Sequence, residues 1–194
     1  MSDIEAPLVY VMGPSGAGKD SVLRRARTLL GAGPAVLFAH RYITRPADSG
    51  GENHVALTRP EFAVRRARGL FAFDWHAHGN DYGIGSEIHA WRRAGFAVVV
   101  SGSREHFQHL GPDAPFLRPV VITAPMDMLA ARIADRGRED RAAMAERLER
   151  GTAFAVDHAS LVTIVNDGPL DNAARAFARL IVDLVKPPSS DRRV

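Results

Sequence analysis

The stretch GPSGAGKDS, from Gly13 to Ser21, constrains the fold of this chain more than any other part of the sequence. It follows an apolar run of strand length, Leu8 to Met12, and precedes a helical pattern from about Lys19 to Leu30. A strand, a glycine-rich turn and a helix in this order form a phosphate-binding loop, in which backbone N–H groups and the helix N-terminus face an anion. We call residues 13–18 the glycine loop. The arrangement of strand, glycine loop and helix predicts an α/β fold with a site for a phosphorylated ligand.

The motif also assigns roles to individual residues. Lys19 is expected to reach the β and γ phosphates of a nucleotide, and the glycines allow the backbone to curl around them. A glycine-rich turn without a ligand is the alternative, which the complete arrangement of strand, loop, lysine and helix disfavours. The predicted ATP site consists of Gly13, Pro14, Ser15, Gly16, Ala17, Gly18, Lys19, Asp20 and Ser21.

Asp20 departs from the usual motif, which has a hydroxyl residue at this position to ligate Mg²⁺. A carboxylate oxygen is also a good ligand for Mg²⁺, and an acidic side chain is favoured in the first turn of a helix. Two interpretations stay open. Either Asp20 or the following Ser21 orients a magnesium ion, or Asp20 is a helix-start residue that faces solvent.

The remainder of the chain alternates between strand and helix patterns, which predicts a largely parallel sheet. The segment 40–83 interrupts this alternation with Gly, Asn, Asp and Pro, and we interpret it as an inserted lobe that covers the substrate. The polar, proline-rich tail 186–194 is expected to be flexible. Strands are predicted at Phe96–Val100, Leu117–Thr123 and Leu161–Asn166, and helices near Ser86–Ala94, Met126–Asp135, Arg141–Phe154 and Leu170–Val185.

Composition restricts the class of protein. A chain of 194 residues is most economically one domain, and its 46% apolar content contains no run long enough for a membrane span. There is no cysteine and no signal-peptide pattern, which fits a cytoplasmic enzyme. We expect a monomer or a homodimer. Lysine occurs only at Lys19 and Lys186, so the cations are nearly all arginine, the fork-shaped donor for phosphates. No basic run is interleaved with aromatic residues, so a nucleic-acid partner is not expected.

A second cationic cluster lies in ARIADRGRED. Arg132 and Arg136 are four residues apart on one predicted helix face, Arg138 follows a glycine, and Arg147 belongs to the next helix. Positioned arginines stabilise the charge that spreads over a phosphoryl group during transfer, so these four are predicted catalytic residues. The alternative is a merely solvated arginine-rich face.

The motifs GPSGAGK, ITRP, FDWHAHGNDYG, RIADRGR and IVNDG, in this order over residues 8 to about 185, resemble the guanylate kinase family. The resemblance implies a three-layer fold of the nucleoside monophosphate kinase type, with a lid around 136–140 and an acceptor-binding lobe at 40–83. It also implies that Arg45 holds the acceptor phosphate, that Tyr82 touches it and that Asn166 lies beside the adenine. Asp74 either contacts the acceptor or anchors Arg45 or a nearby turn.

The guanine-reading residues of that family are largely missing here: their places are taken by Ala47 or Asp48, by His54, by Ile84 and by SGSR at 101–104. The stretches MGPSGAGKDS, AHRYITR, GGENHVAL, WHAHGNDYG and VVVSGSREH are instead similar to the ribose 1,5-bisphosphate phosphokinases of phosphonate breakdown. This resemblance implies phosphorylation of that sugar by ATP with Mg²⁺ to give 5-phosphoribosyl 1-diphosphate. The additional acceptor-binding residues would then be Arg41, His54, Arg104, Ser101 and Ser103.

Two other functions stay open at this stage, a nucleoside monophosphate kinase that accepts GMP and a binding module that has lost catalysis. Weaker features are expected to be structural. His76 and His78 are spaced like a metal pair, but no third ligand is evident. His106 and His109 are expected on a solvated helix face, and Trp75 is expected to pack.

Overall fold

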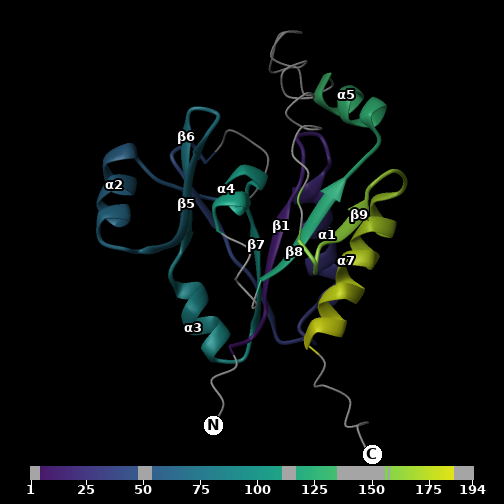
Figure 1. The fold of residues 1–194 in the computed structure, drawn as a ribbon, viewed down its shortest axis with the longest axis horizontal. Coiled ribbons are helices and arrows are strands. Elements are labelled where there is room, and N and C mark those ends of the chain that lie inside the picture. The colour runs from purple at the N-terminus through teal and green to yellow at the C-terminus, as the bar shows by residue number, and fades with distance from the viewer. Residues whose placement is uncertain (1–4, 48–53, 111–116, 135–155, 157, 186–194) are drawn as a thin grey trace, which may run out of the picture.

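A five-stranded sheet, which we call sheet A, organises the computed structural model of this chain, which describes residues 5–47, 54–110, 117–134, 156 and 158–185. The neighbouring strands are all parallel, so their carboxyl ends lie at one edge of the sheet (Figure 1). The strand order is β2 (Val36–Phe38), β7 (Ala97–Ser101), β1 (Leu8–Met12), β8 (Leu117–Thr123) and β9 (Val162–Val165).

Strand β1 is buried on both of its faces, as expected for the centre of a parallel sheet. Successive side chains of a strand point to opposite faces, so Val9 and Val11 join one hydrophobic cluster while Leu8, Tyr10 and Met12 join another. The continuous apolar run in the sequence is thus explained by two cores that share one strand.

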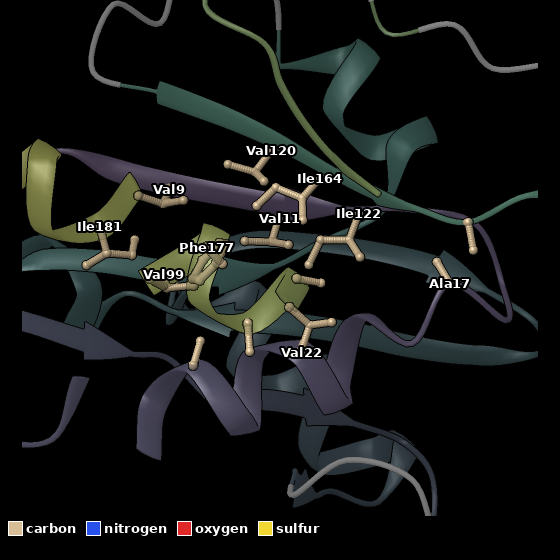
Figure 2. Close-up of a cluster of buried hydrophobic side chains, with 14 of the residues drawn as sticks. Val9, Val11, Ala17, Val22, Val99, Val120, Ile122, Ile164, Phe177 and Ile181 are labelled. Atoms are coloured by element: carbon tan, nitrogen blue, oxygen red, sulfur yellow. The ribbon is translucent and has the colours of Figure 1, made fainter. Parts of the chain in front are cut away.

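The first core lies between sheet A and two helices, α1 (Lys19–Leu30) and α7 (Leu170–Val185). Figure 2 shows Val22 of α1 and Phe177 and Ile181 of α7 packed against the valines and isoleucines of the sheet. An ion pair also joins the two helices. Two of the guanidinium nitrogens of Arg25, Nε and Nη2, donate to the Asp171 carboxylate at 2.7 and 2.9 Å. This arrangement fixes the segment that follows β9 relative to the start of α1.

The opposite face of sheet A is covered by α3 (Glu87–Arg93), α4 (Arg104–His109) and a second sheet. Ile88 of α3 and Phe107 of α4 are buried in this second core together with Ile84. Helices on one face and a mixed layer on the other give the three-layer α/β arrangement that the sequence predicted.

The second sheet, sheet B, is formed by the predicted inserted lobe. Its order is β4 (Val55–Ala56), β3 (Arg41–Ile43), β6 (Asn80–Gly85) and β5 (Phe71–Ala77), with helix α2 (Arg59–Ala67) beside it. Strands β5 and β6 form a hairpin whose two turn residues, His78 and Gly79, have φ of 49° and 71°. Two successive positive φ values define the tight turn that matches strand twist.

Most predicted elements of the core are confirmed within one or two residues, including β1, α1, β8 and α7. Helix α5 (Met126–Ala134) follows β8 as predicted. The sequence analysis missed β2, because three residues are too few for a periodic pattern to emerge. The helix expected around His106 and His109 is α4. The predicted helix Arg141–Phe154, the lid at 136–140 and the tail lie outside the described residues. No helix within the described residues is long and apolar enough to cross a membrane.

The first core predicts a large effect of truncating Phe177, which is fully buried between α7 and the sheet. We expect Phe177→Ala to lower the free energy of unfolding by about 3–5 kcal/mol, because it removes apolar contact and leaves a cavity. Urea denaturation followed by circular dichroism measures this change.

The matched control is Val64→Ala on α2, where the side chain is 62% exposed. Its effect is expected to stay within about 0.5 kcal/mol. Similar losses for the two variants would contradict the assigned core.

Candidate active site

The candidate site lies where the strands of sheet A end. The glycine loop follows β1, the Ser101–Ser103 segment ends β7, and Asn166 follows β9. Backbone hydrogen bonds hold these segments together: Gly102 N donates to Val11 O at 2.8 Å, and Asn166 N donates to Thr123 O at 2.7 Å. Loops at the carboxyl ends of parallel strands are the usual position of ligand sites in such sheets.

The glycine loop has a backbone that only glycine adopts readily. Gly16 and Gly18 have φ of 83° and 77°, which is the left-handed region. Gly13 lies so close to β8 that a Cβ on it would overlap the carbonyl oxygen of Ile122. The three glycines of the motif are therefore required by the geometry of the loop, as the phosphate-binding interpretation predicts.

Asn166 holds the glycine loop from the other side. Its side chain is buried, and its Nδ2 donates a hydrogen bond to Ala17 O at 2.9 Å. The same Nδ2 lies 2.6 Å from the position that a Cβ on Gly18 would occupy, which is a second reason for glycine there. Asn166 is thus an anchor of the loop, a role that the sequence did not indicate. Its predicted contact with the adenine stays a prediction.

A pocket of about 350 Å³ opens beside the loop. Arg132 of α5 contributes to its wall, and the Nη1 atom of this guanidinium is buried without a hydrogen-bond partner among the described residues. An unpaired buried donor is costly in a folded protein, so a ligand or segment that accepts from it would be stabilising. The pocket is lined by Gly16, Gly18, Ser21, Arg132, Asn166, Gly168 and Leu170. These residues fit a nucleotide, because backbone glycines, polar side chains and one cation surround the space.

Three charged side chains lie together, two at the start of α1 and one on β3. Lys19 Nζ lies 3.1 Å from Oδ1 of Asp20, and the Nη2 atom of Arg41 lies 3.8 Å from the same oxygen. Asp20 therefore does not simply face solvent, because it forms ion pairs with two cations. The predicted magnesium role of Asp20 and Ser21 stays a prediction. The described residues contain no group of three His, Cys, Asp or Glu side chains that would hold a metal by itself.

The predicted acceptor-binding residues of sheet B lie on adjoining strands. Arg41 is in β3, and its guanidinium lies over the ring of Tyr82 in β6 at 5.5 Å. Tyr82 stacks on Trp75 with ring centroids 5.5 Å apart and planes 5° apart. The sequence analysis expected Trp75 only to pack, and the structure shows that it supports a predicted substrate residue.

Arg45 and His54 lie next to each other in the same lobe. The buried His54 has its Nε2 3.1 Å from the carbonyl oxygen of Arg45, so it supports the backbone that carries this arginine. Within the part of the chain that the structure describes, the Nε of Arg45 is buried without a hydrogen-bond partner. An unpaired guanidinium donor is the feature expected of an arginine that binds an absent anion.

The segment after β7 contains three further predicted residues. The hydroxyl of Ser101 is buried and has no hydrogen-bond partner in the described ranges. Ser103 is the N-cap of α4, and its Oγ accepts from the backbone N–H of His106 at 3.5 Å. Arg104 begins the helix, and burial lowers the pKa of its guanidinium. Ser103 thus has a structural role that the sequence did not reveal.

Asp74 has a different partner from the arginine that the sequence analysis considered. Its Oδ1 lies 2.7 Å from Nε of Arg66 on α2, so it anchors this helix to β5. Contact between Asp74 and the acceptor stays a prediction. Nδ1 of His76 lies 2.8 Å from Oδ1 of Asp81, whereas His78 is in the hairpin turn.

His106 was expected on a solvated face, and this expectation is wrong. Its ring is half-buried, with Nδ1 2.8 Å from the Tyr10 hydroxyl and the ring centroid 5.2 Å from that of Trp75. Burial lowers the pKa of His106, although the nearby Asp74 opposes this shift. His106 connects α4 to sheet B, and nothing in its local sequence distinguishes it from the exposed His109.

Three of the predicted catalytic arginines, Arg136, Arg138 and Arg147, lie outside the described residues. Among the four predicted cations of that group, Arg132 is the one that the described chain places beside the pocket.

Comparison with known proteins defines the class of fold first. A guanylate kinase from Anaplasma phagocytophilum superimposes on this chain with a TM-score of 0.66 at 15% identity, covering 96% of this chain and 89% of that one. At this identity the likeness shows the fold alone. The fold is therefore of the guanylate-kinase-like class, with the glycine loop after its first strand. A scan against models of known families finds no match.

Curated relatives define the family. Ribose 1,5-bisphosphate phosphokinase PhnN from Desulfomicrobium baculatum is 50% identical over 91% of this chain and 94% of that protein. The proteins of the same name from Chromobacterium violaceum and Burkholderia pseudomallei are 49% and 50% identical, over 92% of this chain and 95% and 97% of theirs. This chain therefore belongs to the ribose 1,5-bisphosphate phosphokinase family.

The anchoring of the glycine loop by Asn166 is testable by Asn166→Ala. The variant leaves the buried Ala17 carbonyl oxygen without its donor, so we expect a loss of about 1–3 kcal/mol in the free energy of unfolding. We also expect weaker ATP binding in titration calorimetry, because the loop loses its support. Asn172→Ala is the control, since Asn172 is exposed on α7 and its removal should cost less than about 0.5 kcal/mol.

The environment of His106 predicts a pH dependence of stability. In the unfolded chain the imidazole takes up a proton near its ordinary pKa of about 6.5, whereas burial delays protonation in the folded protein. Acidification through this window therefore favours the unfolded state. We expect wild-type protein to lose more unfolding free energy between pH 7.5 and pH 5.5 than His106→Asn, measured by urea denaturation.

His109→Asn, at an exposed position of the same helix, is the control and should keep the wild-type pH dependence. An unchanged pH dependence in His106→Asn would contradict the assigned environment.

Proposed function

We propose that this protein is an ATP-dependent kinase that phosphorylates ribose 1,5-bisphosphate to 5-phosphoribosyl 1-diphosphate. The observation that carries this proposal is the family membership, with about 50% identity over more than 90% of the chain to proteins that bear this name. The geometry of the candidate site supports it, because unpaired or desolvated cations gather around the glycine loop and on sheet B.

On the nucleotide side, the glycine loop would hold the phosphates of ATP and Lys19 would contact the β and γ phosphates. The base and ribose would occupy the pocket beside Asn166 and Leu170. Arg132 would bind phosphate oxygens, which satisfies its unpaired Nη1. Arg136, Arg138 and Arg147 are proposed to complete this set from the lid and the following helix.

On the acceptor side, the substrate has two phosphates and a sugar but no base. Arg41, Arg45 and Arg104 are proposed to bind the phosphates, because each carries a planar fork of donors suited to them. Ser101 would meet a sugar hydroxyl with its unpaired oxygen. His54, Asp74, Tyr82 and Ser103 would complete the site, partly through the structural contacts described above.

The reaction transfers one phosphoryl group. The bond between the γ phosphorus and the bridging oxygen of ATP breaks, and a bond forms between that phosphorus and an oxygen of the acceptor's 1-phosphate. The second pKa of a phosphate is about 6, so the attacking oxygen is already ionised at pH 7 and needs no general base. The protein therefore has to orient two anions in line and neutralise their charge.

Mg²⁺ bound with ATP would supply additional charge neutralisation at the phosphates. Asp20 or Ser21 at the start of α1 is proposed to hold it, since both lie at the mouth of the glycine loop. We further propose that the enzyme acts in the cytoplasm as a monomer or homodimer.

The test is ADP production with ATP and Mg²⁺, comparing ribose 1,5-bisphosphate with GMP at equal concentration. We expect turnover of the sugar and little with GMP, and phosphorus NMR should show a new diphosphate. Lys19→Ala should lower kcat about 10²- to 10³-fold, because one positioned cation at the transferring group is lost.

Val64→Ala is the control and should keep wild-type activity, because its side chain is exposed on α2. Faster turnover of GMP would instead indicate a nucleoside monophosphate kinase. A folded protein that does not bind ATP at millimolar concentration would indicate a binding module without catalysis.

A further inference from the structure

Asp20 connects the two halves of the candidate site. One of its carboxylate oxygens, Oδ1, is 3.1 Å from Lys19 Nζ at the glycine loop and 3.8 Å from the Nη2 atom of Arg41 on sheet B. The first cation belongs to the proposed nucleotide site and the second to the proposed acceptor site. This carboxylate oxygen therefore lies between a cation of the proposed nucleotide site and a cation of the proposed acceptor site.

The two cations are far less accessible than the carboxylate between them. The Lys19 and Arg41 side chains are 14% and 12% exposed, whereas that of Asp20 is 42% exposed. Cations withdrawn from water in this way gain from a nearby negative charge. A hydroxyl residue, which most loops of this type carry at the position of Asp20, is neutral and would not attract either cation.

Arg41 is held from a second direction. Its guanidinium lies over the Tyr82 ring at 5.5 Å, and Tyr82 is stacked on Trp75. The aromatic ring fixes the guanidinium relative to sheet B, and Asp20 fixes it relative to the glycine loop. Arg41 thus has contacts on both sides, with Asp20 at the glycine loop and with Tyr82 on sheet B.

We propose that Asp20 is a positioning residue for acceptor binding, which orients Arg41 so that an anionic group of the acceptor is bound next to the glycine loop. The inference rests on the proposed function and goes beyond it, because it explains the departure from the usual motif by a link between the sites. It gives Asp20 a role that is separate from magnesium binding, and the two roles make different predictions.

The test is a double-mutant cycle with Asp20→Asn, Arg41→Gln and the double variant. Asparagine keeps the size of the side chain and removes its charge, and thermal unfolding checks that each variant is folded. At saturating ATP, we expect Asp20→Asn to raise the KM for ribose 1,5-bisphosphate about tenfold, the order expected for one lost charge-assisted contact. Once Arg41 is replaced, the same Asp20 change should add less than about twofold.

Titration calorimetry with Mg²⁺ and a non-hydrolysable ATP analogue supplies a readout other than activity. Without acceptor, Asp20→Asn should change the dissociation constant of the analogue far less than it changes acceptor binding, because Arg41 belongs to the proposed acceptor site. A dependence on Mg²⁺ concentration like that of the wild type would assign the ion to Ser21. Binding of ribose 1,5-bisphosphate to the complex with the analogue should weaken as KM does.

Glu61→Gln is the matched control, since Glu61 is 48% exposed and pairs with an arginine, Arg65, at 2.6 Å on α2. It should leave KM and both binding constants unchanged.

Independent effects of the Asp20 and Arg41 changes would overturn the proposal. A shifted Mg²⁺ dependence with unchanged acceptor binding would also overturn it, in favour of the metal role. These outcomes differ from failure of the proposed function, in which wild-type protein turns over GMP and not the sugar. In that case the same cycle, measured on the KM for GMP, still decides whether Asp20 positions Arg41. A wild-type protein that neither binds nor turns over any acceptor would overturn both.

Discussion

The burial of β1 on both faces is the constraint on which the rest of the structure depends. Val9 and Val11 pack against α1 and α7 on one face. Leu8, Tyr10 and Met12 pack against α3, α4 and sheet B on the other. The neighbouring strands β7 and β8 pair with β1 in parallel on either side, and parallel sheets of this kind are usually covered on both faces. The glycine loop then emerges between two strand ends, where Asn166 and the Ser101 segment also meet it.

Several polar groups that we propose to bind ligands are buried in the described chain without hydrogen-bond partners. The described chain leaves Nε of Arg45, Nη1 of Arg132 and the hydroxyl of Ser101 buried without hydrogen-bond partners. All three were predicted site residues, and such unpaired groups reduce stability unless a ligand satisfies them. By contrast, Nε and Nη2 of Arg25 donate to the Asp171 carboxylate and fasten α7 to α1.

Sheet B carries Arg41, Asp74 and Tyr82, which we propose to bind the acceptor, so we expect it to contribute to specificity. The chain shares its fold with a guanylate kinase at only 15% identity, so the fold by itself does not decide the acceptor. In this chain, aromatic side chains lie between sheet B and the core. Trp75 lies between Tyr82 and His106, and Nδ1 of His106 contacts the Tyr10 hydroxyl on β1. This group fixes sheet B relative to the glycine loop and holds Tyr82 under the guanidinium of Arg41.

The sequence by itself determined the α/β class, the glycine loop, most core elements and the set of arginines, because these depend on local periodicity and on a motif of fixed spacing. Tertiary structure decided the pairing of Asp20 with Arg41, the anchoring of Ala17 by Asn166 and the burial of His106. Asn166 is 149 residues from Ala17, and His106 is 96 residues from Tyr10. Contacts at such separations arise from how the layers of the fold stack. The sequence neighbours of a residue do not indicate which distant group it will contact.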